Sequence, residues 1–187
     1  MKTGIILLIV LGVAVVCGSA FVSQRNKLAA GREAIHAQWS QVDADLQRRA
    51  DLVPNLVETV KGYAKEETGV MGAVASARAA MAGAATPQQK IDANNELTGA
   101  LGRLLVVVEN YPALRASENF RQLQFELAGT ENRILQSRRR YNDAVKDYNV
   151  ALSQFPANVV GSISGFQRED AYFKTDALGR AVPKVQF

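Results

Sequence analysis

The sequence has little of the chemistry that most metal and redox sites need. Among its 187 residues it holds one cysteine, one histidine and one tryptophan. A single cysteine cannot form an intrachain disulfide, and one cysteine with one histidine cannot complete a tetrahedral zinc site of Cys and His ligands. A di-metal centre of the ferritin type is also excluded, because it needs two Glu-x-x-His pairs. We therefore expect no metal and no cofactor.

Motifs for nucleotide binding and hydrolysis are absent as well. There is no Gly-x-Gly-x-x-Gly fingerprint and no phosphate-binding loop. Gly161-Ser-Ile-Ser-Gly165 has the outline of a nucleophile elbow, but its central residue is Ile163. His36 has no serine or cysteine nucleophile in a recognisable turn to activate. The sequence thus predicts no catalytic residue and a protein that is not an enzyme.

Positive charge is concentrated at the amino-terminal end of the chain. The formal net charge is +4, from 22 Lys and Arg against 18 Asp and Glu, and residues 34–187 are nearly balanced. The densest basic run is Arg138-Arg139-Arg140. A helix spreads three consecutive residues over about 200° of arc, so this run cannot form one flat phosphate-binding patch. We expect a solvated face or contacts with a neighbouring subunit there, and no nucleic acid as partner.

One long uncharged run occupies residues 5–22. As a helix it would measure about 27 Å, close to the thickness of the hydrocarbon core of a bilayer. We interpret residues 1–24 as an uncleaved transmembrane anchor. The alternatives are a signal peptide cleaved near Gly18-Ser19-Ala20 and a lipidated Cys17. The predicted membrane-spanning residues include Ile5, Leu8, Leu11, Val15, Phe21 and Val22.

Basic residues flank this run unevenly. Lys2 precedes it, whereas Arg25, Lys27 and Arg32 follow it. The excess of Lys and Arg on the second side favours a cytoplasmic location for the rest of the chain. The same three residues are candidates for contacts with anionic lipid headgroups, at about 1 kcal/mol each, although a stop signal would also account for them.

Apolar residues beyond the run follow the spacing of helices. Asp51 is a candidate N-cap with Pro54 in the first turn of a second helix, and one kinked continuous helix is the alternative. A helical face then continues from Leu56 to the alanine-rich stretch that ends at Ala85. We expect Gly62, Gly69 and Gly72 on it to permit close approach of a neighbouring backbone. The stripe before this face, with coiled-coil steps of 7, 4, 3, 4 and 7, consists of Leu28, Ile35, Trp39, Val42, Leu46 and Val53.

Two further helices have clear start and stop signals. Thr86-Pro87-Gln88-Gln89 predicts a capped start, and Tyr111-Pro112 predicts the end of that helix. Ser117 is the expected cap of the longest helix, which reaches about Gln154. The expected apolar stripe of the first of these helices is Leu97, Leu101, Leu104 and Val108, and that of the second is Phe120, Leu123, Leu127, Ile134, Tyr141, Val145, Tyr148 and Leu152. No alternating pattern long enough for a strand occurs before residue 157. The predicted fold is all-α: a transmembrane helix, an elongated antiparallel bundle of about four helices at residues 25–156, and an irregular tail at 157–187 that packs on the bundle or on a neighbouring subunit.

Several motifs in one order resemble those of the bacterial LemA family, over about residues 21–173. The longest is Asp43-Ala-Asp-Leu-Gln-Arg-Arg-Ala-Asp-Leu-Val-Pro-Asn-Leu-Val-Glu, and it continues to Glu66. Lys65 departs from the pattern, since many members carry histidine there, which weakens a metal or proton-relay role at that position. The other motif residues are found in Glu109-Asn-Tyr-Pro, Thr130-Glu-Asn-Arg, Arg139-Arg-Tyr-Asn, Tyr148-Asn and Gly165-Phe.

The resemblance implies a single amino-terminal anchor followed by an antiparallel helical bundle in the bacterial inner membrane. It implies no enzymatic activity and no catalytic residues. Some members look like lipoproteins, which would place the bundle outside the cytoplasm. The residues of this sequence that match the family motifs are Asp43, Arg48, Arg49, Asp51, Pro54, Asn55, Tyr63, Tyr111, Pro112, Asn132, Arg133, Tyr141 and Asn142.

Charged residues in the motifs have ordinary interpretations. The pairs Asp43/Asp45 and Glu66/Glu67 have members on different helix faces, so we expect solvated or helix-capping carboxylates there. Arg48 and Arg49 are expected to form ion pairs with Asp51 and Glu58 near a helix junction, and an anion site is the alternative.

The leading hypothesis is a non-enzymatic, membrane-anchored helical-bundle scaffold or interaction protein that self-assembles. Small residues Ala14 and Gly18 in the anchor have a spacing that favours helix association. A module that binds anionic or curved membrane surfaces is the second hypothesis, and an undetected hydrolase or an accessory to a membrane protease is the third. The expected partners are the lipid bilayer, further copies of the chain and other membrane proteins.

Overall fold

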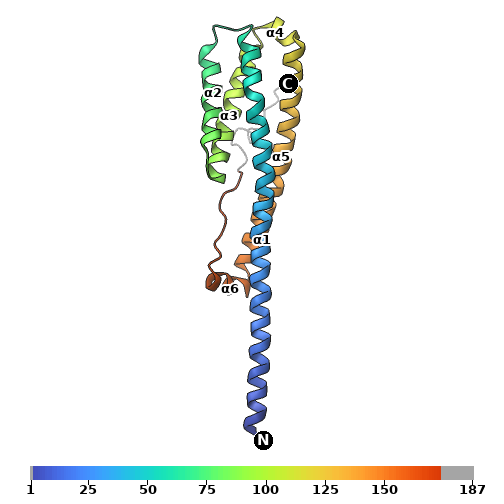
Figure 1. The fold of residues 1–187 in the computed structure, drawn as a ribbon, viewed down its shortest axis with the longest axis vertical. Coiled ribbons are helices and arrows are strands. Elements are labelled where there is room, and N and C mark those ends of the chain that lie inside the picture. Colours follow the sequence, from blue (N-terminus) through green and yellow to red (C-terminus); the bar gives the residue numbers. More distant parts are fainter. Residues whose placement is uncertain (1, 174–187) are drawn as a thin grey trace, which may run out of the picture. The chain divides into compact units, whose positions relative to one another are not determined.

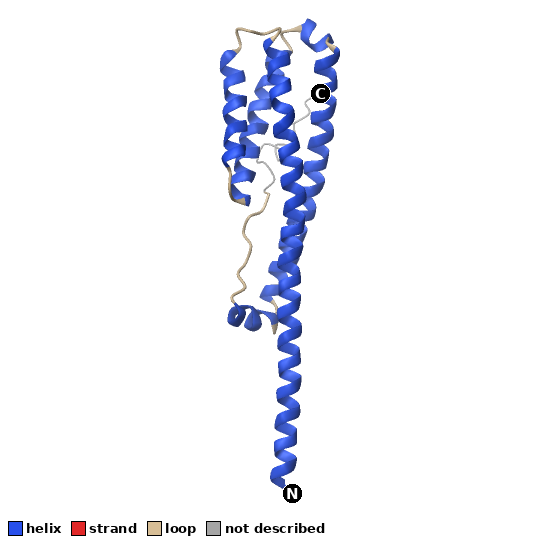
Figure 2. Cartoon of the chain, viewed as in Figure 1, coloured by secondary structure: helices blue, strands red, loops and turns tan. Residues whose placement is uncertain are grey.

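The computed structural model describes residues 2–173, and every regular element among them is a helix (Figures 1 and 2). The part of the predicted tail beyond residue 173 lies outside the described residues. The predicted all-α class is confirmed. The helices are α1 (Lys2–Lys61), α2 (Thr68–Gly83), α3 (Pro87–Val108), α4 (Pro112–Ala116), α5 (Glu118–Ser153) and α6 (Ala157–Ser164).

The chain divides into two compact units, and α1 and α5 contribute to both. The first unit contains residues 1–41 and 139–170. It holds the start of α1, the end of α5 and α6. Among the described residues, the second unit contains residues 42–138 and 171–173. It holds the end of α1, all of α2, α3 and α4, and the start of α5, arranged as an antiparallel bundle of four main helices.

The apolar stripes predicted from the sequence form the cores of these units. In α1, the predicted residues from Leu28 to Val53 are buried, except that Trp39 is half-buried. In α3 the predicted stripe is buried throughout. In α5 the stripe is buried at Phe120 and from Ile134 onward, and half-buried at Leu123 and Leu127. The helical period therefore predicted the buried faces, because burial repeats with the period of the helix.

Pro54 lies inside α1, which is continuous from Lys2 to Lys61. The predicted helix start at Asp51 is therefore wrong, and continuation of one helix is correct. Proline lacks the N–H that would bond to the carbonyl four residues earlier, here that of Ala50. The Nε of Arg78 on α2 donates a hydrogen bond to this carbonyl at 3.0 Å. A side chain of the neighbouring helix thus supplies the missing donor.

We expect Arg78→Met to lower the free energy of unfolding by about 1–2 kcal/mol, because the carbonyl of Ala50 loses a charged donor. In a Pro54→Ala background the same change is expected to cost less, since the substituted alanine would supply a backbone N–H. Urea unfolding of the detergent-solubilised protein, followed by circular dichroism at 222 nm, measures both costs. Arg103→Met, at an exposed arginine of α3, is the matched control. Equal costs in the two backgrounds would show that Arg78 does not compensate for Pro54.

The first interhelical turn lies at residues 62–67, beyond the predicted junction. The expectation of one helix from Leu56 to Ala85 is therefore wrong. After Lys61 the chain tightens, with the amides of Tyr63 and Ala64 both donating to the carbonyl of Val60 at 3.0 and 2.8 Å. Ala64 is buried beneath this turn.

Close approach of helices occurs at other glycines than expected. A Cβ atom at Gly69 or Gly72 would meet nothing within 4 Å, so the expected compensation at these positions is wrong. At Gly31 on α1, a Cβ atom would lie 3.2 Å from Cδ2 of Tyr148 on α5. Gly31 is therefore where these two helices come close together in the first unit.

The later helix boundaries follow their sequence signals. The Thr86 hydroxyl accepts a hydrogen bond from the amide of Gln89, and the Gln89 side chain accepts one from the amide of Thr86, which completes the predicted capping box. The hydroxyl of Ser117 accepts from the amide of Phe120 at 3.3 Å, at the start of α5. The two short helices α4 and α6 were not predicted, and α6 replaces the first part of the expected irregular tail.

Candidate functional site

The predicted membrane-spanning residues lie on a part of α1 that is exposed at residues 3–20 and at Val22. Their exposed fractions run from 55% at Val22 to 70% at Leu8, and Phe21 is half-buried. None of the most apolar 18-residue window of α1 is buried in the structure. A helix that is apolar on all sides and contacts nothing has the length and composition needed to cross a bilayer.

The three predicted headgroup-binding residues have different surroundings. Arg25 and Lys27 are exposed. The guanidinium of Arg32 stands over the ring of Phe166, 5.7 Å from its centroid, in a cation–π contact. Arg32 therefore attaches the segment after α6 to α1 as well as carrying a charge.

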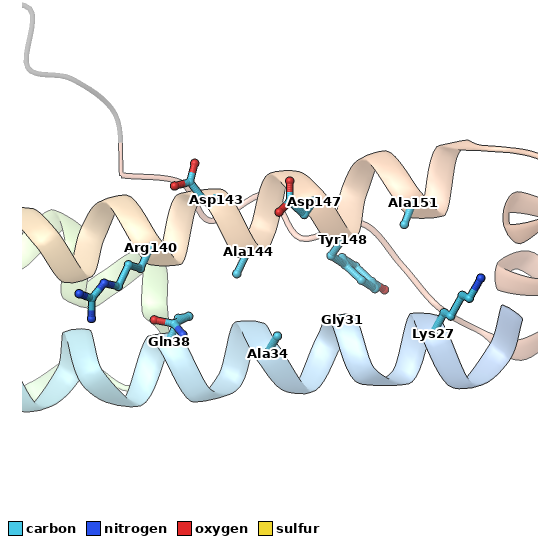
Figure 3. Close-up of a pocket in the computed structure, with 10 residues that line it drawn as sticks. All are labelled: Lys27, Gly31, Ala34, Gln38, Arg140, Asp143, Ala144, Asp147, Tyr148 and Ala151. Carbon is cyan, nitrogen blue, oxygen red and sulfur yellow. The ribbon is translucent and has the colours of Figure 1, made fainter. Parts of the chain in front are cut away.

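Lys27 also lines a groove of about 450 Å³ between α1 and α5 in the first unit (Figure 3). Tyr148 points toward Gly31 across this groove, while the carboxylates of Asp143 and Asp147 point away from α1 (Figure 3). Arg140 lines the groove from α5. The groove is thus lined by two cations, Lys27 and Arg140, and by two carboxylates, those of Asp143 and Asp147. Because these charges balance, the groove has no excess positive charge with which to select an anion.

The motif residues Tyr148 and Asn149 hold the segment that follows α6. The Tyr148 hydroxyl donates to the carbonyl of Gln167 at 2.8 Å, and burial raises the pKa of this hydroxyl. The Asn149 side chain donates to the carbonyl of Glu169 at 2.7 Å and accepts from its amide at 3.0 Å. These two neighbouring motif residues therefore clamp an extended segment onto the end of α5.

Arg49 joins three helices of the second unit. It is 6% exposed, and its guanidinium donates to the side-chain oxygens of Asn94 at 2.8 Å and Thr98 at 3.0 Å, both on α3. It also forms an ion pair of 3.2 Å with Glu131 on α5. Burial lowers the pKa of Arg49, the carboxylate of Glu131 opposes this, and the charge of Arg138 adds to it. These three acceptors satisfy the buried guanidinium, so Arg49 has a structural role in joining the helices.

The ion pairs expected around the first motif are replaced by other contacts. Arg49 pairs with Glu131 rather than with Asp51 or Glu58, so that expectation is wrong. Asp51 instead accepts from Gln47 at 2.9 Å, and Glu58 pairs with Lys61 at 3.5 Å. Arg48 is exposed.

The first acidic pair of the motif is less exposed than expected. Asp43 forms an ion pair with Lys90 on α3. Asp45 is buried, at 6% exposed, so the expectation of a solvated or capping carboxylate is wrong for this residue.

The remaining motif residues serve turns, packing and solvent-facing positions. Tyr141 packs edge-on against Trp39, with ring centroids 5.3 Å apart. The hydroxyl of Tyr111 donates to Glu67 at 3.4 Å, and Pro112 starts α4. Arg133 donates to Thr130 at 3.0 Å. Asn55, Tyr63 and Asn132 are exposed, and Asn142 is half-buried.

A large apolar groove on the second unit was not predicted. It has a volume of about 730 Å³ and lies between α1, α3 and α5, with Arg49 and Glu131 at its polar part. Phe125 in its wall is 81% exposed, and Leu105, which also lines it, is 40% exposed. One sequence signal was available: Phe125 lies off the stripe of Phe120, Leu123 and Leu127, so a large aromatic had to face outward. This groove is the candidate interaction surface.

The described residues contain no cluster of three His, Cys, Asp or Glu side chains that could hold a metal ion. His36 is exposed, on the first unit. The structure thus brings the motif residues together in packing and clamping contacts, and the best-defined surfaces are the exposed apolar helix and the apolar groove.

Comparison with known proteins agrees with the sequence motifs. The chain is 26% identical over 180 residues to magnetosome protein MamQ 2 of Paramagnetospirillum magneticum, covering 82% of this chain and 66% of the relative. It is 22% identical over 141 residues to protein LemA of Metamycoplasma hominis, covering 75% of this chain and 64% of the relative. It spans slightly less than two thirds of the length of these curated relatives, and none of these names denotes an enzyme. Because the model of the LemA family matches residues 38–187, the chain belongs to the LemA family.

Proposed function

We propose that this protein is a non-enzymatic, membrane-anchored interaction protein that assembles with further copies of itself. The observation that carries the proposal is the continuity of α1, which runs unbroken from an exposed apolar segment into the core of a helical bundle. A helix without a break between these parts joins the bundle directly to the segment that enters lipid. Residues 1–24 are the proposed anchor.

Charge supports a specific placement in the cell. The basic residues Arg25, Lys27 and Arg32 follow the apolar segment, which favours a cytoplasmic bundle on a single-pass protein of the bacterial inner membrane. The proposed partners are the lipid bilayer, other copies of the chain and other membrane proteins.

The apolar groove of the second unit supports self-assembly. Soluble surfaces seldom expose large aromatic side chains beside an apolar cleft without a partner. Phe125 and Leu105, which both line the groove, would lose most of their exposed area in a contact between copies. Helical bundles present such grooves to amphipathic partner helices, and another copy of the chain offers suitable helix faces.

Native mass spectrometry of the detergent-released full-length protein tests this proposal. We expect discrete multiples of 20.3 kDa. Phe125→Ser combined with Leu105→Ser is expected to shift the distribution toward the monomer by at least tenfold, because both residues line the groove and would lie in the contact. Tyr63→Ser, at another exposed aromatic of the second unit, is the matched control. A monomer at micromolar concentration in the unmodified protein would contradict self-assembly.

A further inference from the structure

A second uncharged stretch lies in the first unit, far along the chain from the proposed anchor. Residues 148–167 contain no Asp, Glu, Lys, Arg or His, and they include all of α6. Beyond the end of α5, three large apolar side chains of this stretch face outward. Phe155 is 83% exposed, Val159 is 49% exposed and Ile163 is 71% exposed. Val159 and Ile163 are four residues apart, so they share one face of α6.

The opposite face of α6 is firmly packed. Ala157, Val160 and Gly161 are buried. A Cβ atom at Gly161 would lie 2.4 Å from Cδ1 of Leu152 on α5 and 3.5 Å from Cδ1 of Leu28 on α1. Any larger residue at this position would require the Leu152 side chain to move. Gly165 then ends the helix with φ 73° and ψ 22°, a left-handed conformation that glycine adopts at low cost. The outward apolar face therefore belongs to a helix that is fixed against α1 and α5.

The contacts between α1 and α5 give the level of α6 relative to the anchor. Trp39 contacts Tyr141, Gly31 lies against Tyr148, and Leu28 and Leu152 meet at Gly161. As the α1 number falls, the α5 number rises, so the two helices are antiparallel here. The carboxyl-terminal end of α5 therefore lies toward the anchor, and Phe155 follows this end. Figure 1 shows α6 beside α1, near the end of α5.

The distance from the apolar run to this level is short. Leu28 is six residues beyond Val22, or about 9 Å along the helix axis. The headgroup layer on each side of a bilayer is about 5–8 Å thick, and interfacial helices lie at its boundary with the acyl chains. If residues 5–22 span the hydrocarbon core, the level of Leu28 lies at or just beyond the outer edge of the headgroup layer, and side chains between that level and Val22 lie within the layer.

We propose that Phe155 and the Val159–Ile163 face of α6 form an interfacial contact with the same bilayer that α1 spans. This inference rests on the proposed membrane anchor. The occupant is lipid, because the surface is uncharged and continues the apolar segment of α1 at the level of the membrane boundary. Exposed Arg25 and Lys27 on the intervening turn of α1 add attraction to anionic headgroups. The contact gives the bundle a second attachment to the membrane, besides the spanning helix.

The test uses the full-length protein with Cys17→Ser, reconstituted in vesicles of phosphatidylcholine and phosphatidylglycerol. Ile163→Cys carries a fluorescent label, and lipids brominated near the headgroup or near the chain ends serve as quenchers. We expect a blue-shifted label that is quenched at least twofold more by shallow than by deep bromines. Val13→Cys is the anchor control and should favour deep bromines. Gln136→Cys, an exposed position of the second unit, is the aqueous control and should not be quenched.

The two proposals fail in different ways in this experiment. A label at residue 163 that is as unquenched as the label at 136, with residue 13 quenched, overturns the interfacial contact and leaves the anchor in place. A blue-shifted but unquenched label at 163 shows a protein contact, which also overturns it. An unquenched label at residue 13 overturns the anchor itself.

A displaced α6 supplies a further check. Gly161→Leu introduces a side chain where Leu152 and Leu28 already lie, so we expect α6 to move away from α1 and α5. Quenching of the label at residue 163 by shallow bromines should then change at least twofold, while quenching at residue 13 stays the same. Asn158→Leu, at an exposed position of the same helix, is the matched control. Unchanged quenching in Gly161→Leu would contradict a contact that depends on the position of α6.

Discussion

Leu11→Arg combined with Val15→Arg is expected to release the protein from the membrane. Both residues lie near the middle of the apolar part of α1, and both are exposed, at 59% and 63%. An arginine at the centre of a spanning helix costs about 2.5–3.5 kcal/mol on the insertion scale. Two of them cost roughly 5–7 kcal/mol, which corresponds to a change of about 10⁴-fold in the partition between membrane and water. Carbonate extraction of cell membranes followed by immunoblotting measures the retained fraction.

The control separates insertion from a general effect of added charge. Ala37→Arg with Ala44→Arg places the same two charges on exposed positions of α1 beyond the apolar segment. We expect this variant to remain in the membrane fraction. If the Leu11/Val15 variant also stays in the carbonate-resistant pellet at the level of the unmodified protein, residues 5–22 are not the anchor.

The local signals of the sequence predicted the helices whose stabilising groups are also local. The capping box of Thr86 and Gln89 is complete within four residues, and Ser117 caps α5 in the same way. The stripes of α3 and α5 were predicted because the period of the helix repeats over many turns. For such elements, the groups that fix the boundary lie within one turn of it.

The junction after Pro54 was misplaced because its stabilising partner is distant. A proline costs least in the first turn of a helix, so the sequence favoured a helix start there. The donor that permits a continuous helix is Arg78, which lies 28 residues away from the carbonyl it bonds. No spacing rule relates the two positions. Folding of α2 against α1 brings them together.

The contacts of Arg49 were mispredicted for the same reason, because its partners are distant in sequence. Its neighbours in sequence, Asp51 and Glu58, were its expected partners, yet its observed partners lie on α3 and α5. Short helices were missed for another reason. In α6, which has eight residues, a helical period scarcely repeats, and the close approach at Gly161 depends on two other helices. The groove beside Phe125 likewise arises from three helices that the sequence does not orient.

Asn94→Leu is expected to lower the free energy of unfolding by about 3 kcal/mol. Asn94 is 1% exposed and accepts a hydrogen bond of 2.8 Å from Arg49. Leucine would remove one of the three acceptors around a buried guanidinium, and a hydrogen bond to a charged group is worth more than a neutral one. Urea unfolding of the full-length protein in detergent, followed by circular dichroism at 222 nm, measures the loss. Asn95→Leu, at the adjacent exposed position, is the matched control.

The double variant Arg49→Met with Asn94→Leu distinguishes a charge effect from a packing effect. If the cost of Asn94→Leu comes from the hydrogen-bond acceptor that the Arg49 guanidinium loses, removing that charge should recover at least ~1.5 kcal/mol of the free energy of unfolding, half of the loss. Thr98 and Glu131, which remain, are accessible enough to be hydrated, since Thr98 is exposed and the Glu131 side chain is 47% exposed. Losses that simply add in the double variant would mean that leucine disturbs the packing of α3. In that case the motif arginine would contribute to the bundle independently of Asn94, through Glu131 and Thr98.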